Sequence, residues 1–175
     1  MFDVLIFVKP NAKNVKIPDF IKKINQNAFK DAKMLIKVEF SEFSELEIIE
    51  DELFKNSSIE FITIPPKVTK IGSSSFQNCK KLSIEFLPDS KLKLIDNLAF
   101  CESGIKKFII PKSVTKIGYK SFGNCQELTE IQFEENSELN TIDDSAFYKT
   151  SIENICFPPS VKQLGKSIFC DSYYI

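Results

Sequence analysis

The sequence predicts a repeat solenoid: a curved, right-handed coil with one parallel β-sheet and short helical or 3₁₀ turns, between the α/β and mostly-β classes. The segment 110–133, IPKSVTKIGYKSFGNCQELTEIQF, recurs with starts at residues 17, 64, 110 and 157, a period of 46 or 47 residues. A weaker unit fills each gap and reduces the step to 22–25 residues. Self-similarity at such a period is typical of stacked units that share one core.

Every step contains an isoleucine or leucine followed five positions later by phenylalanine. The pairs are Ile24/Phe29, Ile49/Phe54, Ile71/Phe76, Ile95/Phe100, Ile117/Phe122, Ile142/Phe147 and Leu164/Phe169. Because a solenoid stacks equivalent positions, we expect each phenylalanine ring to lie on the ring of the preceding coil in one shared interior.

Seven segments are predicted as strands, because apolar residues alternate with variable ones at their ends. They are 12–17, 35–40, 59–64, 82–86, 105–110, 128–133 and 152–157. Stacked about 4.8 Å apart, they would form a parallel ribbon roughly 30 Å wide. The segment 82–86 is one residue shorter than the others, so we expect a local adjustment in its first half.

The connections follow two patterns. Proline follows alternate strands, where it ends the ladder and turns the chain. Gly72, Gly118 and Gly165 follow the apolar residue of their pair, where a tight turn or positive φ is expected; Asn25 fills this slot in the first step. The Ser-x-x-Phe and Asp-x-x-Phe sequences that come next predict a single helical or 3₁₀ turn.

The expected domain organisation is an N-terminal cap over residues 1–11 and a solenoid of about seven coils over 12–175, the last coil incomplete. The chain stops where an eighth strand should begin. This apolar edge favours either end-to-end self-association or a chain cut from a longer array, and the sequence leaves both open.

Composition and charge argue against several functions. The net charge of −1 provides no clustered basic surface for nucleic acid or for an anionic membrane. The apolar run Val4–Val8 is too short for a signal peptide or a membrane span. No histidine is present, and the glycines are isolated, so we expect no enzyme and no cofactor. Catalysis by paired carboxylates would require two facing acids in a deep pocket.

The five cysteines are interpreted as structural thiols rather than disulfides or metal ligands. Cys79 and Cys125 occupy equivalent positions three residues after a phenylalanine. They lie two coils apart, about 10 Å by the strand spacing, which is too far for a disulfide. Other steps hold alanine, serine or threonine in this slot, so we expect a small, half-buried niche in the wall, buried structural thiols in it and no metal site.

The phrase IPxxVTKIGxxSFxNCxxLxxIxF resembles the BspA-like class of leucine-rich repeat, over residues 12–170. The chain departs from the better-known leucine-rich pattern by lacking the asparagine ladder and by using isoleucine and phenylalanine in place of leucine. The resemblance implies a cell-surface protein of the kind found in bacteria and parasitic protists, some of which resemble adhesins for extracellular-matrix or host proteins. The missing signal peptide indicates a cytoplasmic location instead, so the compartment stays open.

The outward strand positions form two rows on the exposed face. One row reads Lys16, Glu39, Thr63, Glu85, Ile109, Gln132 and Cys156, and the other reads Asn14, Lys37, Phe61, Ser83, Lys107, Glu130 and Asn154. Opposite charges on neighbouring strands, such as Lys16 beside Glu39, would support the ladder. Apolar side chains among charges are typical of binding surfaces, although neighbouring side chains could partly cover Phe61. The predicted ligand-binding residues are Phe61, Ile109, Lys107, Lys37 and Glu85.

The sequence therefore predicts a non-enzymatic protein-binding module. The first hypothesis is a surface-type adhesion domain that recognises a host or matrix protein through its strand-lined concave face. The second is a cytosolic scaffold or regulatory subunit.

Overall fold

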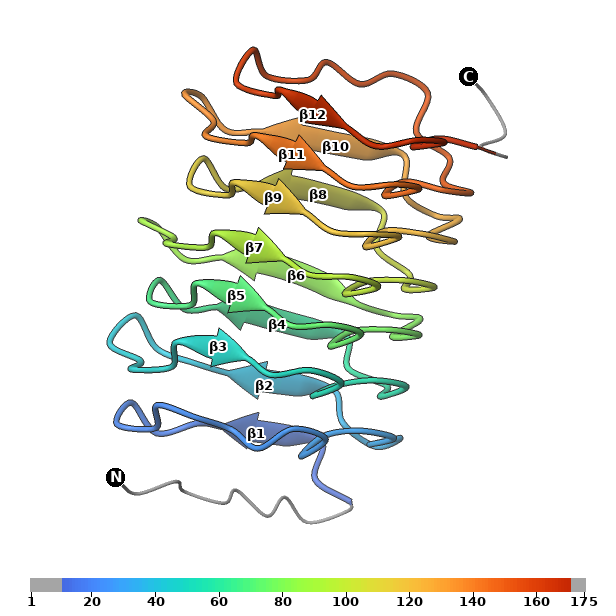
Figure 1. Cartoon of the computed structure of the whole chain (residues 1–175). Coiled ribbons are helices and arrows are strands. Elements are labelled where there is room, and N and C mark those ends of the chain that lie inside the picture. Colours follow the sequence, from blue (N-terminus) through green and yellow to red (C-terminus); the bar gives the residue numbers. More distant parts are fainter. Residues whose placement is uncertain (1–10, 171–175) are drawn as a thin grey trace.

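The computed structural model describes residues 11–170, which form a right-handed solenoid of stacked coils (Figure 1). Viewed with the N-terminus at the bottom, the chain runs from right to left behind, returns from left to right in front and rises by one coil. Residues 1–10 of the predicted cap and residues 171–175 of the predicted last coil lie outside the described residues.

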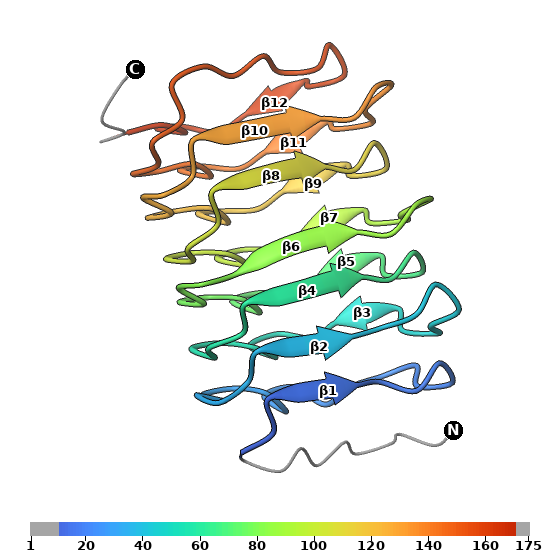
Figure 2. The same cartoon turned by 180° about the vertical axis from the view of Figure 1, so that it is seen from behind.

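Two sets of parallel strands form opposite walls of the solenoid. The strands of three or four residues (Figure 2) are β1 (Asn14–Lys16), β2 (Lys37–Glu39), β4 (Phe61–Ile64), β6 (Ser83–Phe86), β8 (Lys107–Ile110) and β10 (Glu130–Phe133). The two-residue strands are β3 (Ile48–Ile49), β5 (Lys70–Ile71), β7 (Leu94–Ile95), β9 (Lys116–Ile117), β11 (Thr141–Ile142) and β12 (Gln163–Leu164). We call the first set the long strands and the second the short strands.

The prediction of a parallel solenoid is confirmed, but the prediction of a single sheet is wrong. The short strands pair in parallel from β3 to β12 and form a second sheet of six strands. Each contains the isoleucine or leucine of the Ile/Phe pair, and five of these six residues are buried. A strand of two residues is too short to show alternation, so periodicity could not reveal it. The predicted strand at 152–157 is not part of a ladder in the described structure.

The phenylalanine of each step stacks on its neighbours, as predicted. The rings of Phe29, Phe54, Phe76, Phe100, Phe122, Phe147 and Phe169 form one column, with successive centroids 4.9–5.5 Å apart and interplanar angles of 6–18°. Phe76 is completely buried between the rings of the coils on either side. Each contact of this kind contributes about 0.5–1.5 kcal/mol beyond the area it buries.

The predicted helical turns are wrong, because the described residues 11–170 contain no helix. The segment around each phenylalanine is a run of turns in which residues four apart have positive φ, such as Ser74 (54°) and Asn78 (60°) on either side of Phe76. These left-handed residues interrupt helical hydrogen bonding. Their N–H groups donate to the next coil instead, from Ser74 to the carbonyl of Asn97 (3.0 Å) and from Asn78 to that of Cys101 (2.9 Å).

The tight turn expected at the recurring glycines is present, since the N–H of Ser75 donates to the carbonyl of Gly72 (3.2 Å), but no described glycine has positive φ. Glycine is required for another reason. Instead, an Asp or Asn side chain of the preceding coil crosses this slot. The Oδ1 atom of Asn97 accepts a hydrogen bond from the N–H of Tyr119 (2.9 Å), next to Gly118. A Cβ atom on Gly118 would lie 2.8 Å from both the N and the Oδ1 of Asn97. The same crossing joins Asp51 to the Gly72 coil and Asp144 to the Gly165 coil.

The long-strand wall is interrupted once. Its strands pair in the orders β1-β2-β4-β6 and β8-β10, and β6 does not pair with β8 (Figure 2). The short strands β7 and β9 of the same two coils do pair, so only one wall opens. The interruption follows the short step 82–86, in which no residue separates buried Leu82 from β6. The expected local adjustment is therefore an opening in the sheet.

The described coils also bury two equivalent thiols. The Sγ atom of Cys79 donates to the carbonyl of Phe54 (3.1 Å), and that of Cys125 donates to the carbonyl of Phe100 (3.0 Å). Burial raises the pKa of Cys79 to about 11 and that of Cys125 to about 12. Both are free and fully buried, which confirms the predicted buried thiols, although the niche is closed rather than half-buried.

Replacing Gly118 tests whether the close approach of Asn97 requires glycine in the next coil. Gly118→Ala should lower the free energy of unfolding by about 1–3 kcal/mol, because the new methyl group meets backbone atoms of Asn97 that cannot move away. Gly123→Ala is the matched control, since its added Cβ lies 3.1 Å from the Lys120 side chain. Urea unfolding should show a clearly smaller loss for the control; equal losses would contradict the crossing.

Thiol reactivity tests the buried niche. With 5,5′-dithiobis(2-nitrobenzoate) at pH 8, the exposed Cys156 should react in the folded protein, whereas Cys79 and Cys125 should react only after denaturation. Burial blocks access, and the raised pKa values keep both thiols protonated. Mass spectrometry of peptides from the labelled protein identifies the sites. Rapid native labelling of Cys79 would show that its coil opens.

Candidate functional site

The outer surface of the long strands carries all five predicted site residues. The ladder places Lys37 beside Phe61, Lys16 beside Glu39, and Thr63 beside Glu85. On the other side of the interruption, Lys107 lies beside Glu130 and Ile109 beside Gln132. These pairs confirm the two predicted rows within each segment of the wall.

Phe61 and Lys37 lie together over β2 and β4. The Nζ atom of Lys37 lies 5.7 Å from the centroid of the Phe61 ring, and the ring is half-buried. A hollow of about 300 Å³ borders both residues together with Lys16, Glu39 and Thr63. The pair thus presents an aromatic ring with a cation over it.

The ion pair on this surface differs from the one expected. Lys37 Nζ lies 2.6 Å from Glu39 Oε1 on the same strand, so the salt bridge runs along β2 rather than across to Lys16. The hydrogen bond from Lys37 is the main reason that the pKa of Glu39 lies below its usual value. Two residues apart on one strand, these side chains point to the same face, so they meet without reaching across the ladder.

Ile109 and Lys107 lie together on β8. Ile109 is 53% exposed, and Lys107 Nζ contacts Glu130 Oε2 at 2.6 Å. The hydrogen bond from Lys107 is the main cause of a lowered pKa at Glu130. A hollow of about 160 Å³ is lined by these three residues with Phe108 and Gln132. This arrangement matches the first group in kind: an apolar side chain framed by an ion pair.

Glu85 does not join either group. It is exposed on β6 and borders none of the hollows described for this surface. The interruption between β6 and β8 also divides the predicted site, leaving Phe61, Lys37 and Glu85 on one segment of wall and Lys107 and Ile109 on the other.

Sequence reasoning missed a third hollow, which lies at the interruption itself. It has a volume of about 380 Å³ and is lined by Lys81, Leu82, Ser83, Gly104, Lys106 and Lys107. The signals for it in the sequence are the short step 82–86 and two lysine pairs, 80–81 and 106–107.

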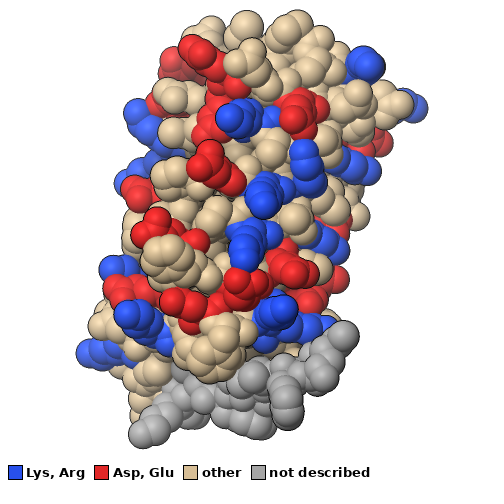
Figure 3. Space-filling view, turned by 90° about the vertical axis from the view of Figure 1, so that its left-hand side faces the viewer, with Lys and Arg blue, Asp and Glu red and all other residues tan. Residues whose placement is uncertain are grey.

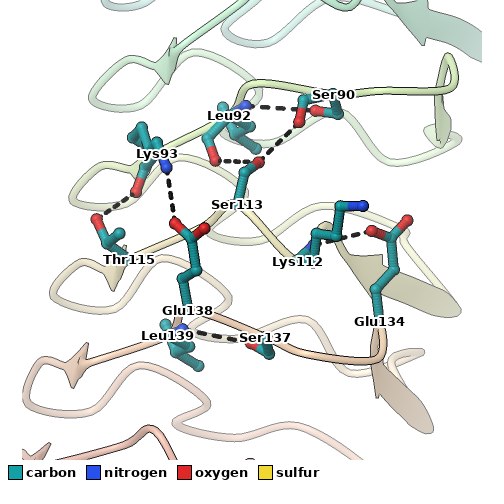
Figure 4. A network of polar contacts seen from close by, with 10 residues as sticks. All are labelled: Ser90, Leu92, Lys93, Lys112, Ser113, Thr115, Glu134, Ser137, Glu138 and Leu139. Atoms are coloured by element: carbon teal, nitrogen blue, oxygen red, sulfur yellow. Dashed lines mark hydrogen bonds and ion pairs between the residues drawn. The ribbon is translucent and has the colours of Figure 1, made fainter.

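The face formed by the proline-containing turns serves mainly to join coils. Lysines and acids are interspersed on it, so it presents no field of one sign (Figure 3). Figure 4 shows how its turns are tied together: Lys93 Nζ contacts Glu138 Oε2 at 2.8 Å, and Ser113 Oγ donates to the carbonyls of Ser90 and Leu92, both at 2.8 Å. These contacts join polar groups of different coils to one another.

Metal binding and membrane crossing find no support within residues 11–170. No group of three or more histidine, cysteine or acidic side chains is arranged to hold a metal ion in this part of the chain. Nor does it contain a helix of the length and apolarity needed to cross a membrane. None of the three hollows is lined by two carboxylates, the arrangement that the catalytic hypothesis required.

Comparison with known proteins agrees with this architecture. The model of the BspA type leucine rich repeat region matches the chain in six copies, over residues 5–90 and 47–175. No curated protein sequence matches it. The crystal structure of the pneumococcal vaccine antigen PcpA is similar over 91% of this chain and 38% of its own, with 27% identity and a TM-score of 0.64.

A leucine rich cell surface protein from Faecalibacterium prausnitzii shares the fold over 90% of this chain and 57% of its own, with 18% identity and a TM-score of 0.51. The chain thus spans 38% and 57% of the length of these two proteins. Repeats of this type typically bind proteins and are generally not enzymes. On the match along nearly its whole length, and on the stacked coils that carry it, the chain belongs to the BspA-type leucine-rich repeat family.

Proposed function

We propose that this chain is a non-enzymatic adhesion module that binds a host or matrix protein through the outer surface of its long strands. The observation that carries the proposal is the repeated arrangement on that surface, where Phe61 and Ile109 each stand beside a lysine–glutamate pair and a hollow. An apolar centre with a charged rim is the usual composition of a protein interface.

The comparisons support a surface role without naming a ligand for this chain. One similar structure is a vaccine antigen and another is a cell surface protein. The alternative, a cytosolic scaffold, is favoured by the buried free thiols Cys79 and Cys125, which need no oxidising compartment. Antibody labelling of intact, unpermeabilised cells distinguishes the two, because only a surface protein is stained.

End-to-end self-association through the C-terminal edge stays a prediction. Strand β12 pairs only with β11 in the described structure, and Leu164 on it is 55% exposed. An exposed edge of this kind can template a further strand. Sedimentation velocity over a range of concentrations tests whether the chain forms larger species.

Substitutions on the long-strand surface test the binding proposal. Phe61→Ser and Ile109→Glu should each weaken partner binding about tenfold or more, because each removes an apolar contact at the centre of the surface. The partner is first captured from candidate host and matrix fractions by the folded solenoid and identified by mass spectrometry. Affinities are then measured by surface plasmon resonance.

Phe43→Ser is the matched control, because Phe43 is 69% exposed but lies in a turn, outside the long strands. It should leave the affinity unchanged, and none of the three changes should lower the melting temperature by more than a few degrees. Normal binding by both Phe61→Ser and Ile109→Glu would show that the partner uses another face.

A further inference from the structure

The opening between β6 and β8 leaves two strand edges facing each other without a partner. Every other pair of successive long strands from β1 to β10 is joined by a parallel ladder. At the opening, the edge of β6 that faces away from β4 and the edge of β8 that faces away from β10 form no ladder within the described structure. Unpaired strand edges are the surfaces to which extended peptides add.

The opening has a closed end and apolar residues beneath it. At the closed end, a Cβ atom on Gly104 would lie only 1.8 Å from the carbonyl oxygen of Lys80, so the two backbones touch there. Along the floor, Ile84 and Phe86 of β6 are half-buried, whereas the inward residues of β4 are fully buried. The rings of Phe86 and Phe108, one from each strand, meet edge to face at 5.6 Å and bring apolar groups of the two coils together beneath the opening.

The lining of the opening is positively charged. Lys81, Lys106 and Lys107 border its 380 Å³ hollow, and no acidic residue does. Their carboxylate partners come from coils away from the opening: Lys81 contacts Glu60 (3.0 Å), Lys106 contacts Glu127 (3.5 Å) and Lys107 contacts Glu130 (2.6 Å). The three lysine side chains are 67–75% exposed. Exposed pairs of this kind contribute little, so the ammonium groups can turn toward a ligand at small cost.

We infer that the opening between β6 and β8 binds an extended acidic segment of the protein partner. The inference rests on the proposed protein-binding function and specifies the chemistry of its ligand. Acidic side chains of the segment pair with Lys81 and Lys106, an apolar side chain covers Ile84 and Phe86, and the main chain bonds to a free strand edge. A small inorganic anion would use only the lysines and leave the floor and edges exposed.

A defined peptide tests the inference without knowledge of the natural partner. Fluorescein-labelled, amidated (Glu-Val)₄ is titrated with the full chain and followed by fluorescence anisotropy, with (Lys-Val)₄ as the opposite-charge probe. We expect saturable binding of the acidic peptide only, weakened by added salt. Hydrogen exchange should slow at amides of β6 or β8 when the peptide is bound. Equal binding of both peptides, or none of the acidic one, would overturn the inference.

Paired variants locate the binding. The double variant Lys81→Gln/Lys106→Gln should raise the Kd of (Glu-Val)₄ about fivefold, because two exposed charge contacts are lost. Lys91→Gln/Lys112→Gln is the control with the same change in net charge, since both lysines are exposed in the proline-containing turns. An equal effect of the two double variants would mean non-specific attraction to charge and would refute the site.

The most direct variant inserts one lysine between Leu82 and Ser83. It restores the residue count of the other steps, so we expect β6 to pair with β8, the opening to close and peptide binding to be lost although positive charge is added. Undiminished binding to this variant, with its fold verified by circular dichroism, would overturn the inference. Sodium sulfate that competes as well as the unlabelled peptide at equal ionic strength would show that only an anion is recognised.

These outcomes are separable from those of the proposed function. Lys107, Phe61 and Ile109 are left unchanged in the peptide experiments. If the peptide fails to bind while Phe61→Ser and Ile109→Glu still lose the partner, only the acidic-segment inference is wrong. If the peptide binds and the surface variants keep full affinity for the partner, the opening is the site and the wider surface is not.

Discussion

The structure depends on the contact between each coil and the next. A single coil cannot bury its own phenylalanine ring, because the two faces of the ring are covered by the rings of the coils before and after it. Phe76 is completely buried because Phe54 and Phe100 stack on its two faces, at 5.1 and 5.3 Å. Backbone hydrogen bonds also join one coil to the next: the N–H of Phe76 donates to the carbonyl of Ala99 in the following coil (2.8 Å). Stability is therefore a property of neighbouring coils rather than of any one of them.

This dependence explains why the repeat alternates between two forms. Coils that carry Asp51, Asn97 or Asp144 extend an oxygen atom to an N–H of the following coil. The following coil must then have glycine at the point of crossing, because a Cβ atom there would lie within 2.8 Å of the residue that crosses. The period of 46 or 47 residues is thus the combined length of two coils: the one that extends the polar side chain and the one that receives it.

The same tight stacking turns a small change in length into a surface feature. Because the phenylalanine column and the short-strand ladder stay in register through the coils of β6 and β8, the missing residue before β6 is not absorbed in the core. The long-strand wall opens instead, between lysines whose carboxylate partners belong to other coils. A departure from the repeat thereby distinguishes one place on an otherwise regular surface.

Much of this arrangement could be predicted from the sequence alone. Periodicity established the solenoid, the phenylalanine column, the rows on the long-strand surface and the buried niche of Cys79 and Cys125, since each depends only on which residue types recur at a fixed interval. Spacing could not reveal the short strands, because two residues carry no alternation. Nor could it reveal the left-handed turns or the reason for glycine, both of which are set by atoms of the adjacent coil. Only the tertiary structure decided that Phe61 and Ile109 lie on separate segments of the long-strand wall. Whether β6 pairs with β8 depends on the positions of two neighbouring coils relative to each other, which the sequence of one coil does not specify.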